Sequence, residues 1–260
     1  MNDVLTWERG FLDEVEGTAV ESGVCLWLLG GPSFALRTRG ALIWIDPYFG
    51  GTPPDSPSGL YRAVAIPINP TLIRYADAVL STHAHIDHCH DATLLPISQH
   101  SSARFIAPAT SAAAMRGFGI PDERIDEVQV GSHVQVGDVE IITCAADDPA
   151  EAGAVSFIIR SGGYTLFFAG DTQDTPLLDA IGENYAIDVA MLAYGEPWYL
   201  SAENLLQAAQ RLRPKTLLPF HWEIWRGFSG NLGRLFTVYA TQTHPFKLQL
   251  LQVGDCLRLP

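Results

Sequence analysis

The segment Ser81-Thr82-His83-Ala84-His85-Ile86-Asp87-His88 is the most informative part of this chain for its expected fold and chemistry. It follows the short apolar run Ala78–Ser81, which predicts a β-strand, so the first histidine stands at the carboxyl end of a strand. In extended backbone, residues two apart point to the same side. His83 and His85 can therefore bind one metal ion together.

The second half of this segment supplies two further ligands. The chain has to turn after His85, so Asp87 and His88 can face a second ion close to the first. Imidazole nitrogens combined with a carboxylate hold zinc, iron or manganese at catalytic sites. The pattern His-x-His-x-Asp-His arises by chance in on the order of one in a few thousand chains of this composition, so a chance cluster is the weaker interpretation.

Two later strands also end in a residue that can bind metal. Asp171 follows the buried run Leu166–Ala169, and His221 follows the run Thr216–Pro219. Taken singly, an aspartate after glycine is commonly a turn residue or helix cap, and a lone histidine is commonly a satisfied core residue. Together with the histidine segment, both are more simply explained as ligands of the same centre.

The order of the remaining elements indicates the fold class. Cys25–Leu29, Phe34–Arg37 and Ala41–Ile45 are short apolar runs separated by turn residues, which predicts adjacent antiparallel strands. After the histidine segment, predicted strands alternate with helices. This order predicts two sheets that face each other, with helices outside them.

Capping and helix-breaking residues predict the element boundaries. Ser201 begins a helix that Pro214 stops, and Asn231 is expected to cap the helix Leu232–Tyr239. Thr110 is expected to cap a helix that Gly117 ends. The other predicted segments are the loop Gly50–Gly59 and the strands Arg104–Ala107, Glu127–Val130, Val134–Val136, Val139–Thr143, Val155–Arg160, Tyr164–Ala169, Ile187–Leu192, Phe246–Val253 and Cys256–Leu259.

Length and composition limit the possible functions. The chain has 260 residues, which suits one large α/β domain, so we expect residues 1–260 to form a single domain. Hydrophobic residues make up 47% and charged residues 17%, which indicates a globular chain and not a disordered one. The net charge of −13 argues against non-specific binding to nucleic acid or anionic lipid. No secretory signal or membrane-length apolar run is found, so we expect a cytoplasmic protein.

At these residues the chain resembles the metallo-β-lactamase superfamily, and the resemblance covers nearly its whole length. The residues that match the metal ligands of that family are His83, His85, Asp87, His88, Asp171 and His221. Asp171 matches the bridging carboxylate. Asp46, at the end of Trp44-Ile45-Asp46, matches a supporting aspartate that orients the histidine loop without binding metal. The resemblance implies an α/β fold, a four-layer αββα sandwich, with the metals at one edge between the sheets.

Within the superfamily, the chain is most similar to the L-ascorbate-6-phosphate lactonase group. The similar segments are Trp27-Leu28-Leu29-Gly30, Ile187-Asp188-Val189-Ala190, Tyr194-Gly195-Glu196 and Pro219-Phe220-His221-Trp222-Glu223-Ile224-Trp225. Many superfamily members place a third histidine of the first metal site before the Gly-Asp strand, and this chain has none there. Either Asp147 or Asp148 replaces that histidine, or the first site is weak.

Residues beside the ligand segments are candidates for supporting roles. His90 is expected to orient a ligand imidazole, whereas Asp91 is expected to cap the next helix. The possible substrate pocket comprises Tyr194, Glu196, Trp222, Trp225 and Arg226. The tryptophans could equally pack over the edge of a sheet. The candidate anchors for an anionic substrate are Arg62, Arg74 and Arg226.

These observations predict a hydrolase that uses one or two divalent ions (zinc, manganese or iron) to activate water. Asp87 and Asp171 are the expected catalytic carboxylates, and the first expected substrate is a small cyclic ester (a lactone) or a related carbonyl compound. Two alternatives stay open, a phosphodiesterase acting on a small organic phosphate and a non-catalytic metal- or ligand-binding protein with an incomplete first site. We expect a small-molecule substrate and no nucleic-acid or membrane partner, and a homo-oligomer is possible.

Overall fold

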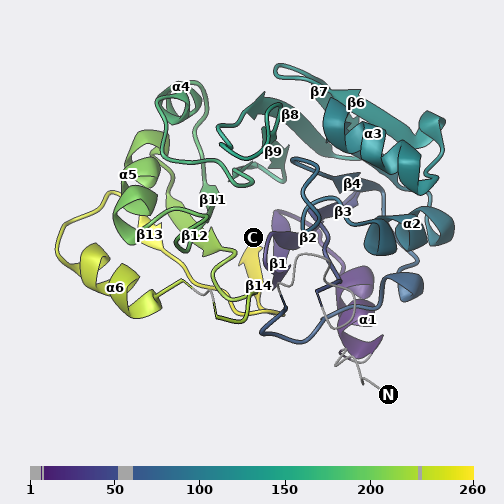
Figure 1. Ribbon diagram of the computed structural model, residues 1–260, viewed down its shortest axis with the longest axis horizontal. Helices are drawn as coiled ribbons and strands as arrows, with labels where there is room; N and C mark the ends of the chain where they lie inside the picture. Colours follow the sequence, from purple (N-terminus) through teal and green to yellow (C-terminus); the bar gives the residue numbers. More distant parts are fainter. Residues whose placement is uncertain (1–6, 8, 52–60, 228–229) are drawn as a thin grey trace.

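The computed structural model describes residues 7, 9–51, 61–227 and 230–260, and these form two mixed β-sheets that face each other (Figure 1). The first sheet has seven strands, in the order β14-β1-β2-β3-β4-β5-β6. Its strands are β1 Val24–Gly30, β2 Ser33–Arg37, β3 Leu42–Ile45, β4 Ala78–Leu80, β5 Arg104–Pro108, β6 Ile125–Val128 and β14 Cys256–Leu259. The meander β1 to β3 is antiparallel, and β3 to β6 are parallel.

The second sheet also has seven strands, in the order β13-β12-β11-β10-β9-β8-β7. Its strands are β7 His133–Val136, β8 Val139–Ala145, β9 Val155–Ser161, β10 Tyr164–Phe168, β11 Val189–Ala193, β12 Thr216–Phe220 and β13 Lys247–Leu248. Strands β7 to β10 are antiparallel, and β10 to β13 are parallel. Each sheet therefore has one antiparallel and one parallel half.

Helices cover the outer face of each sheet, which confirms the predicted four-layer αββα sandwich (Figure 1). The helices α1 Arg9–Gly17, α2 Asp91–His100 and α3 Ala109–Phe118 lie on the side of the first sheet, and α4 Leu177–Asn184, α5 Ala202–Leu212 and α6 Leu232–Ala240 lie on the side of the second. Two short 3-10 helices are η1 Pro70–Leu72 and η2 Asp122–Arg124. None of the described helices has the length and apolar character needed to cross a membrane.

The strands are apolar on both sides because both sides are covered. In β1, Leu26 and Leu28 pack between the sheets, whereas Trp27 and Leu29 pack toward the helices. Phe34 of the first sheet meets the second sheet at Phe168 and Phe220, with ring centroids 5.9 and 5.6 Å apart in edge-to-face contacts. This apolar, closely packed interface holds the two sheets in one fixed relation, so it also positions the groups at their shared edge.

Two predicted helix starts are confirmed. The side chain of Ser201 accepts a hydrogen bond from Asn204 N, and that of Asn231 accepts one from Arg234 N. The predicted boundaries of α3 are wrong. Pro108 is its N-cap and Gly119, in the left-handed conformation at φ 92°, ends it, whereas a solvent-facing Gly117 is tolerated inside the helix.

Other boundaries also differ from prediction. Asp91 is the first residue of α2 and His90 is the N-cap, so the predicted cap is displaced by one residue. The predicted strand Phe246–Val253 reduces to β13, which pairs with β12 only at Thr216 and Leu217. The carbonyls of Lys215 and Leu217 accept hydrogen bonds from β13 and the residue after it. The next residue of β12 that faces this side is Pro219. Because proline has no N–H to donate, the hydrogen-bonded ladder ends there. The loop predicted at Gly50–Gly59 lies mostly outside the described residues, and helices α1 and α4 were not predicted.

Candidate metal centre and cleft

The carboxyl ends of parallel strands bring the candidate residues together at one edge of the sandwich. In the first sheet, Asp46 follows β3 and the histidine segment follows β4. In the second sheet, Asp171 follows β10 and His221 follows β12. Parallel strands end at the same edge of a sheet, and the space outside these ends is where open α/β sheets bind ligands.

His83, His85 and Asp148 form a first group of potential ligands. One atom of each lies within 4.8 Å of the others. His83 Nε2 is 2.9 Å from His85 Nδ1 and 3.7 Å from Asp148 Oδ2. The sequence leaves open whether Asp147 or Asp148 belongs to this group. Asp148 points into the cluster. Asp147 is exposed, and its backbone carbonyl accepts a hydrogen bond from Gln173 N.

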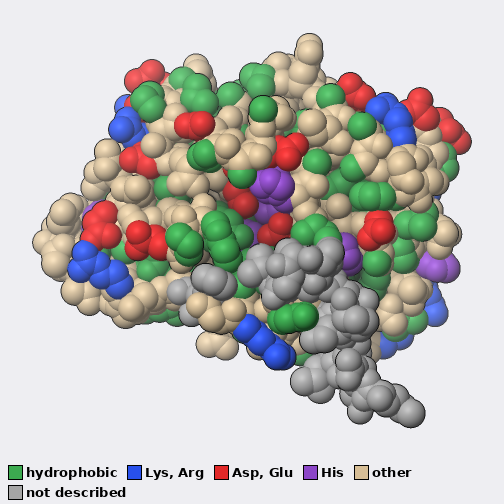
Figure 2. Space-filling model, in the orientation of Figure 1, with side chains coloured by type: hydrophobic (Ala, Val, Ile, Leu, Met, Phe, Trp, Pro, Cys, Tyr) green, Lys and Arg blue, Asp and Glu red, His purple; other side chains and the backbone are tan. Residues whose placement is uncertain are grey.

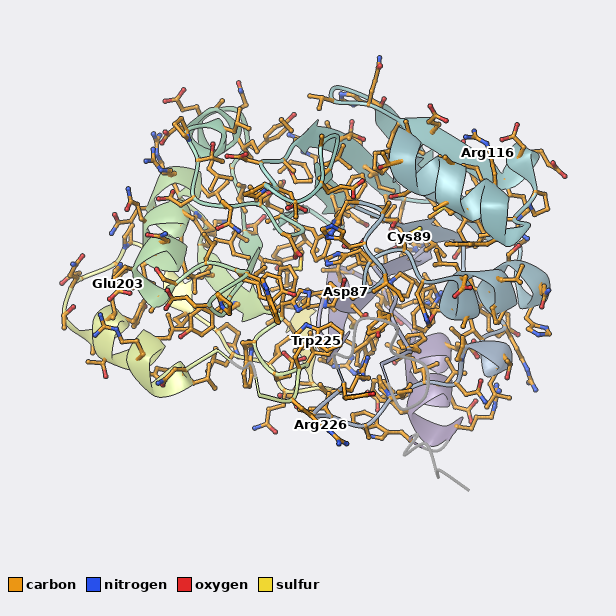
Figure 3. All side chains as sticks on the ribbon, in the orientation of Figure 1. Asp87, Cys89, Arg116, Glu203, Trp225 and Arg226 are labelled. Carbon is orange, nitrogen blue, oxygen red and sulfur yellow. The ribbon has the colours of Figure 1, made fainter. Side chains whose placement is uncertain are left out.

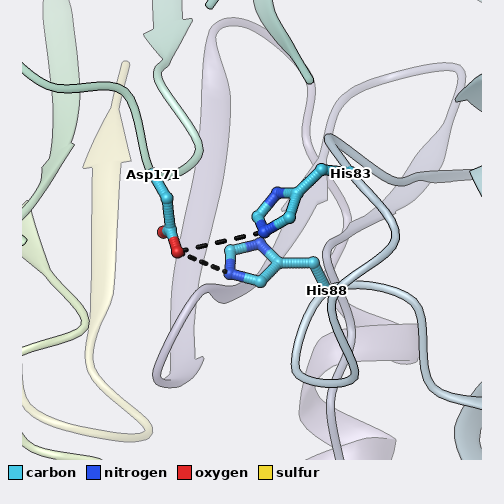
Figure 4. Close-up of side chains that lie close together, drawn as sticks. All are labelled: His83, His88 and Asp171. Atoms are coloured by element: carbon cyan, nitrogen blue, oxygen red, sulfur yellow. Dashed lines mark ion pairs between the residues drawn. The ribbon is translucent and has the colours of Figure 1, made fainter. Parts of the chain in front are cut away.

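Asp87, His88 and His221 form a second group, with ligand atoms again within 4.8 Å of one another. His221 Nε2 lies 3.2 Å from Asp87 Oδ2. Asp171 stands between the two groups (Figure 4): Oδ2 is 3.4 Å from His88 Nε2 and 3.9 Å from His83 Nε2. Its other oxygen, Oδ1, is 4.0 Å from His221 Nε2. The structure therefore brings all six residues of the predicted ligand set into one cluster and adds Asp148.

The chemistry of this cluster fits divalent metal. His88 Nε2, His221 Nε2, Asp148 Oδ2 and Asp171 Oδ1 are buried atoms without a hydrogen-bond partner among the described residues. Buried polar atoms without partners cost free energy, so such a concentration needs a ligand to explain it. Burial lowers the pKa of His83 to about 2, which keeps this imidazole neutral and able to donate its lone pair.

No thiol belongs to the cluster. Cys89 lies between two histidines in the sequence, but its side chain is buried beside Ser111 O, 3.9 Å away (Figure 3). Burial raises the pKa of this thiol to about 12, so it is protonated and unreactive.

Asp46 holds the histidine segment in place. Its carboxylate accepts hydrogen bonds from Thr82 N at 2.8 Å and from Thr82 Oγ1 at 2.6 Å, and it pairs with His88 Nδ1 at 2.7 Å. With Nδ1 held by Asp46, His88 Nε2 is directed at the cluster. Although burial opposes it, Asp171, Asp87 and Asp46 raise the pKa of His88 well above its ordinary value. Asp46 and His221 both have left-handed backbone, at φ 41° and 71°, a strained conformation concentrated at functional sites.

Replacing Asp46 with asparagine should lower kcat/KM by about 10- to 100-fold, the usual cost of losing a partner that orients a ligand. The carboxylate accepts from Thr82 N through Oδ1 and meets Thr82 Oγ1 and His88 Nδ1 through Oδ2. An amide has only one accepting oxygen, so its NH2 group would face one of these donors and the imidazole would lose its preferred orientation. Metal affinity should fall in parallel, as measured by competition with a chromogenic chelator. Asp77→Asn is the matched control, because Asp77 accepts a hydrogen bond from Leu42 N at the other end of β4. Equal losses in both variants would contradict a positioning role for Asp46.

A cleft of about 520 Å³ opens over the cluster, a volume typical of small-molecule sites. Its lining residues are His85, Ile86, Asp87, Asp148, Pro149, Ala150, Asp171, Gln173, Pro197, Trp198, Tyr199 and Trp225. Of the predicted pocket residues, Trp225 lines this cleft, and Glu196 borders a small adjoining hollow that also touches His221. Tyr199 stacks on the His221 ring, with centroids 4.1 Å apart.

The other predicted pocket residues lie elsewhere. The Tyr194 hydroxyl donates to Asn231 O at 2.6 Å, and Trp222 packs against the core beneath α5 and α6. Arg226 donates from Nε to Arg62 O and points away from Asp87 and Trp225 in Figure 3. These residues were expected in the pocket because they are close in sequence to the candidate ligands. Neighbouring side chains of a loop point in different directions, so closeness in sequence does not place a residue in the cleft.

The remaining candidates also occupy other positions. The His90 ring contacts Thr93 Oγ1 of α2 at 2.8 Å and the Tyr48 ring after β3, and no imidazole of the cluster is among these described contacts. Arg62 is buried, donates to Tyr48 O, and has its pKa lowered to about 10 by burial. Arg74 borders a separate surface hollow with Arg9 and Arg37.

Sequence reasoning missed the aromatic wall formed by Trp198 and Tyr199. These residues follow the end of β11, the one parallel strand between the two that deliver Asp171 and His221. The position of β11 between β10 and β12 could have indicated these residues, because the loop that follows the middle strand has to border a site formed by the loops on either side of it.

Comparison with known proteins gives consistent results. A family model described as "Beta-lactamase superfamily domain" matches residues 42–222, a range that contains every residue of the cluster. The Escherichia coli O127:H6 protein called "Probable L-ascorbate-6-phosphate lactonase UlaG" is 26% identical, and the alignment covers 98% of this chain and 86% of that relative.

Two solved structures are similar in fold. Igni18, a metallo hydrolase from Ignicoccus hospitalis, superposes with a TM-score of 0.74 at 22% identity, covering 92% of this chain and 99% of that one. CmlA, a diiron β-hydroxylase from Streptomyces venezuelae, superposes with a TM-score of 0.69 at 18% identity, covering 93% of this chain and 55% of that one. At these identities the likeness concerns the fold, and one fold thus carries different chemistries.

Proposed function

Because this chain belongs to the beta-lactamase superfamily, we propose that it is a metal-dependent hydrolase that opens a lactone or cleaves a related small ester. The observation that carries the proposal is the set of buried, unpartnered ligand atoms gathered beneath an open cleft. The name of the Escherichia coli relative, a lactonase, supports the choice of a cyclic ester.

The proposed ligand assignment follows the two groups in the cluster. His83, His85 and Asp148 would hold one ion, and Asp87, His88 and His221 the other. Asp171 faces both groups and would bridge them. Bound divalent ions would lower the pKa of a trapped water towards neutrality and stabilise negative charge on a substrate oxygen.

Two side chains of the cleft are suited to handle protons. Although burial opposes it, His88 and His221 hold the pKa of Asp87 below its ordinary value, so this carboxylate is ionised and can accept a proton from attacking water. Burial raises the pKa of Tyr199 well above its ordinary value, so its phenol stays protonated. Trp225 Nε1 donates to Tyr199 Oη at 3.5 Å, which leaves the phenolic hydrogen free to orient a substrate carbonyl.

The test combines metal analysis with a substrate panel. Protein purified without chelator should contain one to two equivalents of zinc, manganese or iron, and should hydrolyse at least one lactone faster than bis-p-nitrophenyl phosphate. Faster cleavage of the phosphodiester would favour the phosphodiesterase alternative. Absence of bound metal, or one ion without turnover on any ester, would favour a non-catalytic binding protein.

A further inference from the structure

The walls of the cleft above the cluster are apolar and aromatic. Trp198 is 42% exposed and Ile86 is 37% exposed, and both border the cleft. Pro149, Pro197 and Trp225 continue the wall. Large apolar side chains that stay open to solvent around a concave site indicate that an apolar ligand covers them.

No lysine or arginine lines this cleft among the described residues. The segments outside the description, residues 1–6, 8, 52–60 and 228–229, contain neither residue type. The two arginines in the loops nearest to it are engaged elsewhere: Arg62 is 2% exposed and donates to Tyr48 O, and Arg226 donates to Arg62 O. On the face shown in Figure 2, histidine, acidic and hydrophobic side chains border the central hollow, and the basic ones lie away from it.

Acidic side chains also border the cleft, but three of them belong to the cluster, where bound divalent ions would offset their charge. Asp87, Asp148 and Asp171 border it, and Glu151 lies beside His85, with its Oε2 3.8 Å from Nε2. An anionic substituent away from the ligand cluster would therefore lose its hydration without gaining a positive partner, and it would face a protein of net charge −13.

We propose that the cleft selects an uncharged lactone or ester whose substituent is apolar or aromatic, and that it discriminates against phosphorylated or carboxylated substrates. The reacting carbonyl would lie over the cluster, and the substituent would lie against Trp198, Trp225 and Ile86. The inference concerns the substrate class and rests on the proposed hydrolase function.

A homologous series of substrates tests this selectivity. Among γ-lactones with lengthening alkyl chains, kcat/KM should rise by about three- to fourfold per methylene until the wall is covered, the gain expected for burying one methylene. The same ring carrying a phosphate ester in place of the alkyl chain should react at least about tenfold more slowly than the neutral lactone. An equal or faster rate on the phosphorylated lactone would overturn the inference.

A variant that adds a cation to the wall gives a second test. Trp198→Arg should raise the ratio of phosphorylated to neutral kcat/KM by about tenfold, and added salt should reduce this gain. Phe236→Arg is the matched control, because it makes the same charge change at a 50% exposed position on α6, away from the cleft. An equal change of this kcat/KM ratio in both variants, or no change in Trp198→Arg, would contradict the proposal that the substrate's substituent contacts this wall.

Binding of non-hydrolysable ketones separates this inference from the proposed reaction. Quenching of tryptophan fluorescence would report binding of an alkylcyclopentanone and of a cyclopentanone that carries a phosphate ester. Tighter binding of the neutral ketone, with no turnover of any lactone, would refute the hydrolase and still support the selectivity. Equal or tighter binding of the phosphorylated ketone would refute the selectivity whether or not lactones are hydrolysed.

Discussion

Asp171→Ala is expected to abolish hydrolysis, with a fall in kcat/KM of about three orders of magnitude or more, and to leave less than one metal ion per chain. The carboxylate approaches His83, His88 and His221 from the centre of the cluster, so its loss would remove the proposed bridging ligand from both ion positions at once. An ion that activates water contributes several kcal/mol to the transition state, and each 1.4 kcal/mol corresponds to about a tenfold rate.

The fold of Asp171→Ala should persist, because the two sheets are held by the apolar interface around Phe34, Phe168 and Phe220 and not by this carboxylate. Far-ultraviolet circular dichroism should match the wild type, while metal content from elemental analysis should not. Asp91→Ala serves as the control, since it removes a carboxylate that is 64% exposed at the start of α2. Turnover near the wild-type rate in Asp171→Ala would refute the bridging role.

Asp148→Ala is expected to lower the metal content by about one equivalent and to reduce kcat/KM by at least about 100-fold. Its Oδ2 is buried, lacks a hydrogen-bond partner among the described residues, and lies 3.7 Å from His83 Nε2. Without Asp148, the first ion would depend on His83, His85 and the Asp171 carboxylate that it is proposed to share with the second ion, so it would lose a ligand of its own.

Asp147→Ala provides an internal comparison for this result. The adjacent carboxylate has the same charge but is exposed, and the described contact of this residue is made by its backbone carbonyl. Metal content and kcat/KM should therefore stay close to the wild type. If both substitutions lowered metal content equally, general electrostatics would explain the loss better than coordination by Asp148.

The order of the strands and most residues of the cluster could be predicted from the sequence because their signals are local. Apolar runs marked the strands, and a histidine or aspartate directly after such a run is carried to the edge of a sheet. Even His221, which is far from His88 in the sequence, could be placed in the same cluster because it directly follows the strongly apolar strand Thr216–Phe220. The least accurate boundaries were those of α3 and β13. The glycine that ends α3 and the proline that ends the pairing of β13 could not be identified from the residue type alone, because other glycines and prolines lie nearby.

The composition of the cleft could not be predicted in the same way. Tyr194, Trp222 and Arg226 stand as near to the ligands in sequence as Tyr199 and Trp225 do, yet only the latter two line the cleft. The direction of a loop side chain depends on hydrogen bonds such as Tyr194 to Asn231 and Arg226 to Arg62, which join positions distant in the chain.

The presence of imidazoles and carboxylates at strand ends along one edge of a two-sheet sandwich follows from local sequence patterns, since a strand's apolar pattern and the residue that follows it are both local properties. The selection of Asp148 over Asp147 as the neighbour of His83, and the aromatic wall above them, became evident in the folded structure. Both depend on the packing of one sheet against the other, which sets the direction of each loop side chain through contacts between residues far apart in the chain.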